Sequence, residues 1–241
     1  MRRREAVPSL SLRHGPTVFA RPQDDAVGMF LEIVAGRCYT RRAFYRPTPS
    51  DTVVDIGANI GVFALECHRQ APGIRVHAVE PHPGTCAQLR LNVERNQLGD
   101  TIAVHELAVA DCAGLMYPTP GVSTSGHQSL TREGNGTGIP TVALHELFDR
   151  LGLDRCDLLK VDTEGAELLI VEGAREDVWL RIPRAVFEYH DLEDSGRGER
   201  LRSHLTALGY TCVVVPHAHT TIVGLVYATR KPLSEPENGV G

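Results

Sequence analysis

A short glycine-containing loop between two apolar segments constrains the fold of this chain more than any other feature. Thr52–Ile56 is a run of β-branched and apolar residues that predicts a buried strand, and Val62–Gln70 has the spacing of a helix. The loop Gly57–Gly61 joins them and leaves room only for a tight turn. Gly57 permits that turn and close ligand approach, and Gly61 lets the helix pack near the sheet. The segment therefore predicts an α/β sheet with a ligand site at the carboxyl ends of its strands.

Strand-like and helix-like segments alternate along the rest of the chain. Further strands are predicted at Arg75–Glu80, Ile102–Ala108, Asp157–Val161 and Ala185–Tyr189. Further helices are predicted at Gly84–Asn96, Val142–Leu151, Ala166–Val171 and Glu199–Leu208. This alternation is typical of parallel strands joined by right-handed crossovers. Two closing runs, Thr211–Val215 and Ile222–Ala228, predict an antiparallel pair at the end of a mostly parallel sheet.

The chain is predicted to divide into three segments. Residues 1–50 form an extension in which Ala26–Arg37 has the spacing of a short amphipathic helix, and we expect this extension to cover the ligand site. Residues 51–230 form the α/β domain, and residues 231–241 are a loose polar tail. Pro118–Pro140 is rich in Gly, Ser and Thr, and a substrate lid and simple flexibility explain such a loop equally well.

Composition excludes several classes of function. The 241 residues are 42% apolar, which is enough for one sizeable core, and the net charge of −5 gives no general attraction to nucleic acid or anionic lipid. No apolar run approaches membrane-spanning length, and because no apolar core follows the N-terminal arginines we expect no secretory signal. The six cysteines lack zinc-ligand spacing and are expected to be reduced thiols. We expect a cytoplasmic protein that acts on a small molecule, with a homodimer left open.

Two acids define the ligand of the glycine loop. Asp55 ends the first strand, and Glu80 ends the second. The loop lacks the middle glycine of the dinucleotide fingerprint, and no P-loop lysine follows it. A carboxylate at Asp55 would repel a pyrophosphate but suits an amine or, through water, a sulfonium. A carboxylate at Glu80 can accept hydrogen bonds from both hydroxyls of a ribose. The pattern therefore predicts S-adenosylmethionine as the bound nucleoside.

The remaining cofactor contacts are expected from the loop and the next two strand ends. Ala58, Asn59 and Pro81 flank the two acids, and Leu107 and Ala108 follow the third strand, where they could face the adenine. Asp111 is either an adenine contact or the cap of the turn before Gly114, and we favour the turn.

A second acidic group follows the fourth and fifth strands. Asp162 and Glu164 come at the end of the fourth strand, and Glu188 and His190 share one side of the fifth because they are two residues apart. Asp162, Glu188 and His190 are therefore expected to converge, as a general-base site, a weak divalent-metal site or a hydrogen-bonded network.

Two neighbours of this group have simpler interpretations. Glu167 begins a helix, where an acid favours the dipole, and Lys160 is expected to be structural.

Methyl transfer to a hydroxyl requires an in-line nucleophile and benefits from a base that removes its proton. His190 has the reference pKa nearest neutral, and Asp162 is the other candidate base. Methylation at nitrogen or carbon, an NAD-dependent oxidoreductase and a non-catalytic nucleoside-binding module remain alternatives. The missing middle glycine and Asp55 argue against the oxidoreductase.

Together these motifs resemble the FkbM family of S-adenosylmethionine-dependent methyltransferases. The resemblance rests on Val54–Gly61, Val79–Pro81, Lys160–Glu167 and Glu188–His190. It implies a class I methyltransferase fold, which is a Rossmann-like sheet of seven mostly parallel strands with the last one reversed. It also implies O-methylation of a sugar or natural-product hydroxyl. Asp55, Gly57, Asn59, Gly61 and Glu80 match the family's cofactor motif, whereas Glu106 stands where the family often has an amide.

Overall fold

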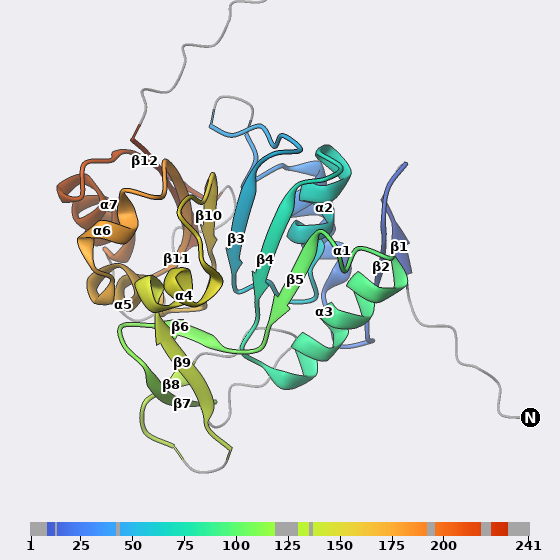
Figure 1. Ribbon diagram of the computed structural model, residues 1–241, viewed down its shortest axis with the longest axis horizontal. Coiled ribbons are helices and arrows are strands. Elements are labelled where there is room, and N and C mark those ends of the chain that lie inside the picture. The colour runs from blue at the N-terminus through green and yellow to red at the C-terminus, as the bar shows by residue number, and fades with distance from the viewer. Residues whose placement is uncertain are drawn as a thin grey trace, which may run out of the picture.

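The computed structural model describes residues 9–12, 14–41, 44–118, 130–134, 137–191, 196–217 and 223–230. Its centre is a seven-stranded sheet (Figure 1). The spatial order is β12 (Thr211–Pro216), β13 (Val223–Thr229), β11 (Arg184–His190), β10 (Leu158–Val161), β3 (Thr52–Ile56), β4 (Arg75–Val79) and β5 (Ile102–His105).

The strand directions confirm the predicted mixed sheet. β3 pairs in parallel with β10 on one side and with β4 on the other. β10 also pairs in parallel with β11, and β4 with β5. β13 is antiparallel to both β11 and β12, between which it lies. The last strand is therefore the reversed one, which is the arrangement that the family resemblance implies.

Helices cover both faces of this sheet. Figure 1 shows α2 (Val62–Gln70) and α3 (Pro83–Arg95) beside β3–β5. It places α4 (Leu144–Leu151), α5 (Glu167–Gly173), α6 (Glu176–Trp179) and α7 (Arg197–Ala207) beside β10–β12. Successive residues of β3 point to opposite faces, so that Val53 joins the core under α2 and Val54 joins the core under α4–α7. This double burial explains why β3 is apolar without interruption.

A second, smaller sheet was not predicted. Its order is β6 (Ala108–Ala110), β9 (Ile139–Ala143), β7 (Gly114–Pro118) and β8 (Leu130–Thr131), and it projects below the main sheet in Figure 1. The predicted strand Ile102–Ala108 is wrong at its end, because β5 stops at His105 and Ala108 pairs with Thr141 of β9 instead. Likewise, Val142 belongs to β9, and α4 begins only at Leu144. Residues 119–129 and 135–136 of the Pro118–Pro140 loop lie outside the described residues, as does the tail 231–241.

The N-terminal extension is less helical than predicted. A single α-helical turn, α1 (Ala26–Met29), continues as the π-helical turn η1 (Phe30–Ala35) and ends before Arg37. A hairpin of β1 (Ser9–Ser11) and β2 (Thr17–Phe19) precedes it.

This hairpin is held on α3 by polar side chains. Asn92 Oδ1 accepts a hydrogen bond from Phe19 N at 2.8 Å, and Asn96 Oδ1 accepts one from Thr17 N at 2.7 Å. β1 and β2 have three residues each, which is too short for a periodic pattern, so the sequence did not predict this hairpin.

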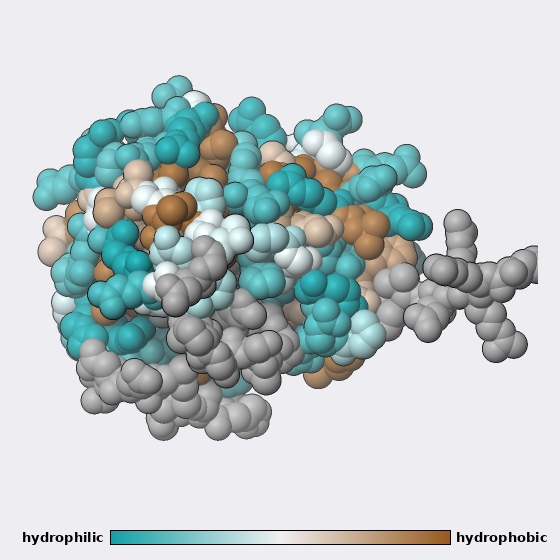
Figure 2. Space-filling view, turned by 90° about the horizontal axis from the view of Figure 1, so that it is seen from below, coloured by the Kyte–Doolittle hydropathy of each residue, from teal (hydrophilic) through white to brown (hydrophobic). Residues whose placement is uncertain are grey.

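The surface shows no dominant apolar region on the face in view. In Figure 2, hydrophilic residues predominate and hydrophobic ones form separate small patches. Within the part of the chain that the structure describes, no helix combines the length and hydrophobicity needed to cross a membrane.

Candidate active site

A cavity of about 560 Å³ opens at the carboxyl ends of β3, β4, β10 and β11. This volume is in the range of small-molecule sites. The strand ends contribute backbone and acidic side chains to its wall, and the N-terminal extension contributes Met29, Glu32, Ile33 and Tyr39 from the other side. One cavity therefore joins the glycine loop to both acidic groups that the sequence singled out.

The glycine loop approaches β10 so closely that its first position requires glycine. Gly57 has φ +76°, and a Cβ there would lie 1.7 Å from the carbonyl oxygen of Asp162. Gly61 has φ +91°, and a Cβ would lie 2.4 Å from Leu89 Cδ1 of α3. Gly57 lines the cavity with Ala58 and Asn59, whereas Gly61 serves the packing of α2 against α3.

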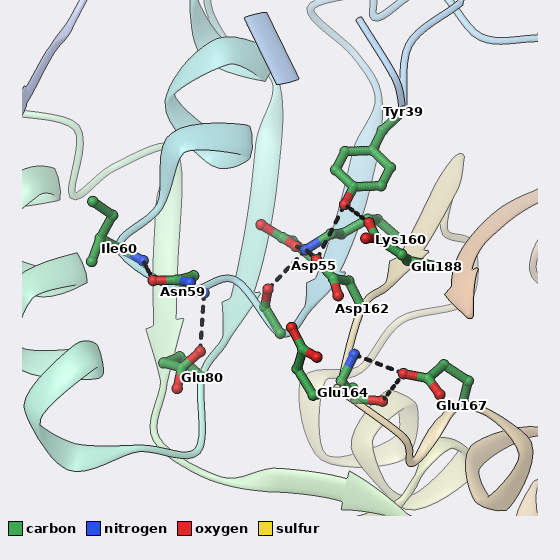
Figure 3. A network of polar contacts seen from close by, with 12 residues as sticks. Tyr39, Asp55, Asn59, Ile60, Glu80, Lys160, Asp162, Glu164, Glu167 and Glu188 are labelled. Atoms are coloured by element: carbon green, nitrogen blue, oxygen red, sulfur yellow. Dashed lines mark hydrogen bonds and ion pairs between the residues drawn. The ribbon is translucent and has the colours of Figure 1, made fainter. Parts of the chain in front are cut away.

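Glu80 connects the end of β4 to this loop. Its Oε2 accepts a hydrogen bond from Asn59 N at 3.0 Å (Figure 3). Its Oε1 accepts a hydrogen bond from His82 N at 2.9 Å. The side chain lines the cavity although the residue is only 7% exposed. Burial raises the pKa of Glu80 to about 7, against the lowering effect of these two backbone donors. Backbone groups of Asn59 and His82 therefore hold the Glu80 carboxylate in the wall of the cavity.

Asp55 lies behind the cavity wall and does not line it. Its carboxylate is fully buried, and Oδ1 is 3.0 Å from Lys160 Nζ of the neighbouring strand β10. Burial raises the pKa of Asp55, and Lys160 only partly offsets the rise. The direct ligand contact that the sequence predicts for Asp55 is replaced in this geometry by an ion pair.

Lys160 has a larger role at the site than the sequence indicates. Its ammonium lines the cavity, donates a hydrogen bond to Gly57 O at 2.7 Å, and lies 3.5 Å from Asp162 Oδ2. Burial lowers the pKa of Lys160, but the carboxylates of Asp55 and Asp162 outweigh burial and raise it above its ordinary value. Lys160 therefore stays charged and links the glycine loop to the second acidic group.

The three residues of the second group do converge. Asp162, Glu188 and His190 each offer a ligand atom within 4.8 Å of the others. The hydroxyl of Tyr39 lies 2.5 Å from Glu188 Oε2 and 3.1 Å from Asp162 Oδ2 (Figure 3). Burial and the nearby Asp162 raise the pKa of Glu188 to about 9. Tyr39 was missed by sequence reasoning, because a lone tyrosine in an irregular segment carries no pattern.

His190 is enclosed by carboxylates. Its Nε2 lies 3.3 Å from Glu164 Oε2 and 3.8 Å from Glu188 Oε1, and its Nδ1 lies 3.9 Å from Glu167 Oε1. Glu167 Oε1 also accepts hydrogen bonds from Thr163 N at 3.1 Å and Gly165 N at 2.9 Å, so this helix-start acid shapes the loop after β10.

Of the residues near the third strand end that the sequence associates with adenine, some line the cavity and some do not. Pro81, Leu107 and Ala108 line it, whereas Glu106 points away and pairs with Arg90 on the surface at 3.5 Å. Asp111 is also outside the lining and pairs with Arg132.

Comparison with known proteins identifies the family. Residues 55–212 match the model of the methyltransferase FkbM domain. The chain belongs to the FkbM methyltransferase family. It is 31% identical to the 31-O-demethyl-FK506 methyltransferase FkbM of Streptomyces tacrolimicus over 244 residues, which cover 87% of this chain and 91% of the relative. It is 29% identical over 123 residues to the hexuronic acid methyltransferase AglP of Haloferax volcanii, covering 51% and 49% of the two chains.

Solved structures support the fold of this FkbM-family chain. The crystal structure of an FkbM methyltransferase from Methylobacillus flagellatus superposes with a TM-score of 0.58 at 19% identity, over 79% of this chain and 46% of that one. The chain thus spans about half the length of that protein. A methyltransferase from Aquifex aeolicus gives a TM-score of 0.51 at 14% identity over 86% and 95% of the two chains.

The FkbM-family chain is an S-adenosylmethionine-dependent methyltransferase. The cavity fits this cofactor. A carboxylate at Glu80 faces the space where a ribose diol would lie, and the crowded Gly57 turn brings backbone rather than side chain to the cavity wall.

Proposed function

We propose that this methyltransferase transfers the methyl group of S-adenosylmethionine to a hydroxyl of a small molecule. The observation that carries the proposal is the position of Asp162, Glu188 and His190 in the same cavity as Glu80 and the glycine loop. The names of two relatives, a 31-O-demethyl-FK506 methyltransferase and a hexuronic acid methyltransferase, support a small, oxygen-rich acceptor.

The cofactor is proposed to lie along the glycine loop. The backbone of Gly57, Ala58 and Asn59 would contact it. Glu80 would accept hydrogen bonds from the two ribose hydroxyls. Pro81, Leu107 and Ala108 would enclose the adenine. Asp55 and Gly61 would act indirectly. Asp55 pairs with Lys160, which donates a hydrogen bond to the loop, and Gly61 allows α2 to pack closely against α3.

The acceptor is proposed to bind on the Tyr39 side of the cavity. When bound, the cofactor supplies an electrophilic methyl group on a positively charged sulfur. The residues of the chain orient the acceptor hydroxyl and take its proton as the oxygen–carbon bond forms. His190 is the proposed base, with Asp162 and Glu188 around it. A carboxyl whose pKa is raised to about 9 already holds a proton at neutral pH, so Glu188 is not the proton acceptor and the released proton goes to His190.

Removal of His190 tests this function. In His190→Ala we expect turnover to fall by about 10²–10⁴-fold, the usual contribution of a general base, with cofactor affinity within about twofold of wild type. Products are followed with a labelled methyl donor against hydroxyl-bearing acceptors. His204→Ala is the matched control, because His204 also lies near a glutamate, Glu172, but on the exposed surface. Normal turnover of His190→Ala on the true acceptor would assign His190 a structural role.

Analysis of the product tests the acceptor atom. O-methylation predicts an ether product, stable to mild acid and carrying one label per acceptor. A label on nitrogen or carbon would contradict the proposal.

A further inference from the structure

The group Asp162, Glu188 and His190 has the spacing of a metal-binding site. Asp162 directly follows β10, and the other two residues lie on one side of the adjacent strand β11. Donor atoms bound to one metal at about 2.1 Å lie within about 4.2 Å of one another. Glu188 Oε1 and His190 Nε2 are already 3.8 Å apart, and all three donors lie within 4.8 Å. Small side-chain rotations would complete the set.

Tyr39 occupies the outer side of this group. Its hydroxyl is within hydrogen-bonding distance of Asp162 Oδ2 and Glu188 Oε2, and it therefore leaves Glu188 Oε1 facing His190. Carboxylates that bind metals are commonly held by hydrogen-bond donors of this kind on their second oxygen. Tyr39 thus orients two of the three donors.

The orientation of the His190 ring is a second observation that favours a ligand on its Nε2 atom. The residue is only 9% exposed, and its buried Nδ1 has no hydrogen-bond partner within the described part of the chain. Buried polar atoms without partners are uncommon in folded proteins. The Nδ1 atom points to Glu167 Oε1 at 3.9 Å, which is beyond hydrogen-bonding distance, while Nε2 lies 3.3 Å from Glu164 Oε2 and 3.8 Å from Glu188 Oε1. A ligating histidine commonly gives its second nitrogen to an outer carboxylate, so a cation on Nε2 would draw the Nδ1 proton onto Glu167 and supply the missing partner.

The charges around the group also favour a cation. Asp162, Glu164 and Glu188 line the cavity beside His190. Lys160 is 3.5 Å from Asp162, but it is also 3.0 Å from the buried carboxylate of Asp55, which offsets its charge. The acceptor side therefore keeps an excess of carboxylates that a divalent cation would neutralise.

We propose that Asp162, Glu188 and His190 bind one divalent transition-metal cation on the acceptor side of the cavity. A mixed set of two carboxylates and one imidazole suits Mn²⁺, Fe²⁺ or Zn²⁺ better than Mg²⁺ or Ca²⁺. The role of the cation rests on the proposed function. It would hold the oxygen of the acceptor hydroxyl and lower the pKa of that hydroxyl, and the proton would pass to a cavity carboxylate outside the ligand set, such as Glu164. In the cation-bound enzyme His190 is therefore a ligand, and it acts as the base only when no cation is bound. An acceptor with a second oxygen next to the methylated one would bind the cation as a chelate.

Titration of Mn²⁺ into the chelator-treated full chain tests the site. Calorimetry and electron paramagnetic resonance are expected to show one Mn²⁺ per chain. Glu188→Gln and Asp162→Asn should each weaken Mn²⁺ binding by at least about 10-fold, because each removes a ligand charge while keeping side-chain size. Glu172→Gln is the control, because it alters an exposed glutamate 3.4 Å from His204 Nε2 and should bind Mn²⁺ as the wild type does.

The site is overturned if the wild type binds no stoichiometric Mn²⁺. It is also overturned if Glu188→Gln and Asp162→Asn both fold normally, as judged by circular dichroism and melting temperature, and bind Mn²⁺ as tightly as the wild type. A ligand variant that does not fold is replaced by His190→Gln, which retains a polar side chain.

Binding of Mn²⁺ is measured without turnover, so the site and the proposed function fail separately. Stoichiometric Mn²⁺ with a label on nitrogen or carbon would overturn O-methylation and leave the site. Undiminished O-methylation after chelation, with no Mn²⁺ bound, would overturn the site and leave the function.

Discussion

Lys160 Nζ lies 3.0 Å from Asp55 Oδ1, and both side chains are almost completely buried between the two central strands. The same ammonium donates to Gly57 O and lies near Asp162. One buried ion pair therefore connects the glycine loop to the group of Asp162, Glu188 and His190. Through Lys160, Asp55 acts on the cavity without lining it.

Lys160→Met should destabilise the fold by about 3–5 kcal/mol, because it leaves the Asp55 carboxylate buried without its cation. Denaturation in urea measures the loss. The double variant Asp55→Asn, Lys160→Met should recover a large part of it, since no uncompensated charge remains. A single variant as stable as the wild type would show that the pair contributes nothing to folding.

Glu80→Gln should weaken S-adenosylmethionine binding by about 10–100-fold, because hydrogen bonds to a charged acceptor contribute about 1.5–3 kcal/mol. Isothermal calorimetry gives the affinity. Glu106→Gln, at the end of the next strand, is the control. Glu106 is outside the cavity lining, so its variant should bind within about twofold of wild type. Equal affinities for all three proteins would remove Glu80 from the cofactor site.

The stability of the cofactor-free protein should depend on pH through Glu80. Its pKa in the folded state is about 7, above the ordinary 4.5, so the folded protein holds a proton that the unfolded chain has lost. The contribution of Glu80 is therefore fully present below pH 4.5 and is lost as pH rises through 7. Relative to Glu80→Gln, the free energy of unfolding should fall by about 3 kcal/mol across this interval. A difference that stays constant with pH would contradict the raised pKa.

Gly57→Ala should destabilise the protein by about 2–5 kcal/mol, from the positive φ and the backbone clash together. The new Cβ would lie 1.7 Å from Asp162 O, a backbone atom that cannot rotate away. Gly99→Ala is the matched control, since nothing lies within 4 Å of a Cβ there. Thermal unfolding compares the two, and equal melting temperatures would exclude the close approach of the loop to β10.

Tyr39→Phe should lower kcat by about 10-fold while cofactor affinity stays within about twofold, because only the hydroxyl that orients Asp162 and Glu188 is lost. Tyr45→Phe is the control, since it also loses one buried tyrosine hydroxyl bond, to Asp51, outside the cavity. A Tyr39→Phe enzyme with normal kcat and raised KM would place Tyr39 in acceptor binding rather than in positioning.

The local pattern of the sequence was sufficient for the main sheet and for most of the cavity wall. The apolar strands β3 and β10 and the glycine turn each have a signal within a few residues, and parallel strands bring their carboxyl ends to one edge. Asp162, Glu188 and His190 could be placed together on that basis, and the structure does bring them together. No local pattern predicted that Ala108 belongs to a second sheet, because its partner Thr141 is more than thirty residues away in the chain.

Residue type and spacing by themselves determined the fold class and the edge of the sheet at which the cavity opens, because both follow from periodicity and from strand ends, which are local properties. The family followed from the resemblance of whole motifs to known proteins. Tertiary structure decided which polar atoms face the cavity. It turned Asp55 inward to Lys160, it left Glu80 in the cavity wall, and it brought Tyr39 from a distant irregular segment onto Asp162 and Glu188. The reason is physical: a side chain's partner and its distance from water depend on segments far away in the chain, and no local pattern contains them.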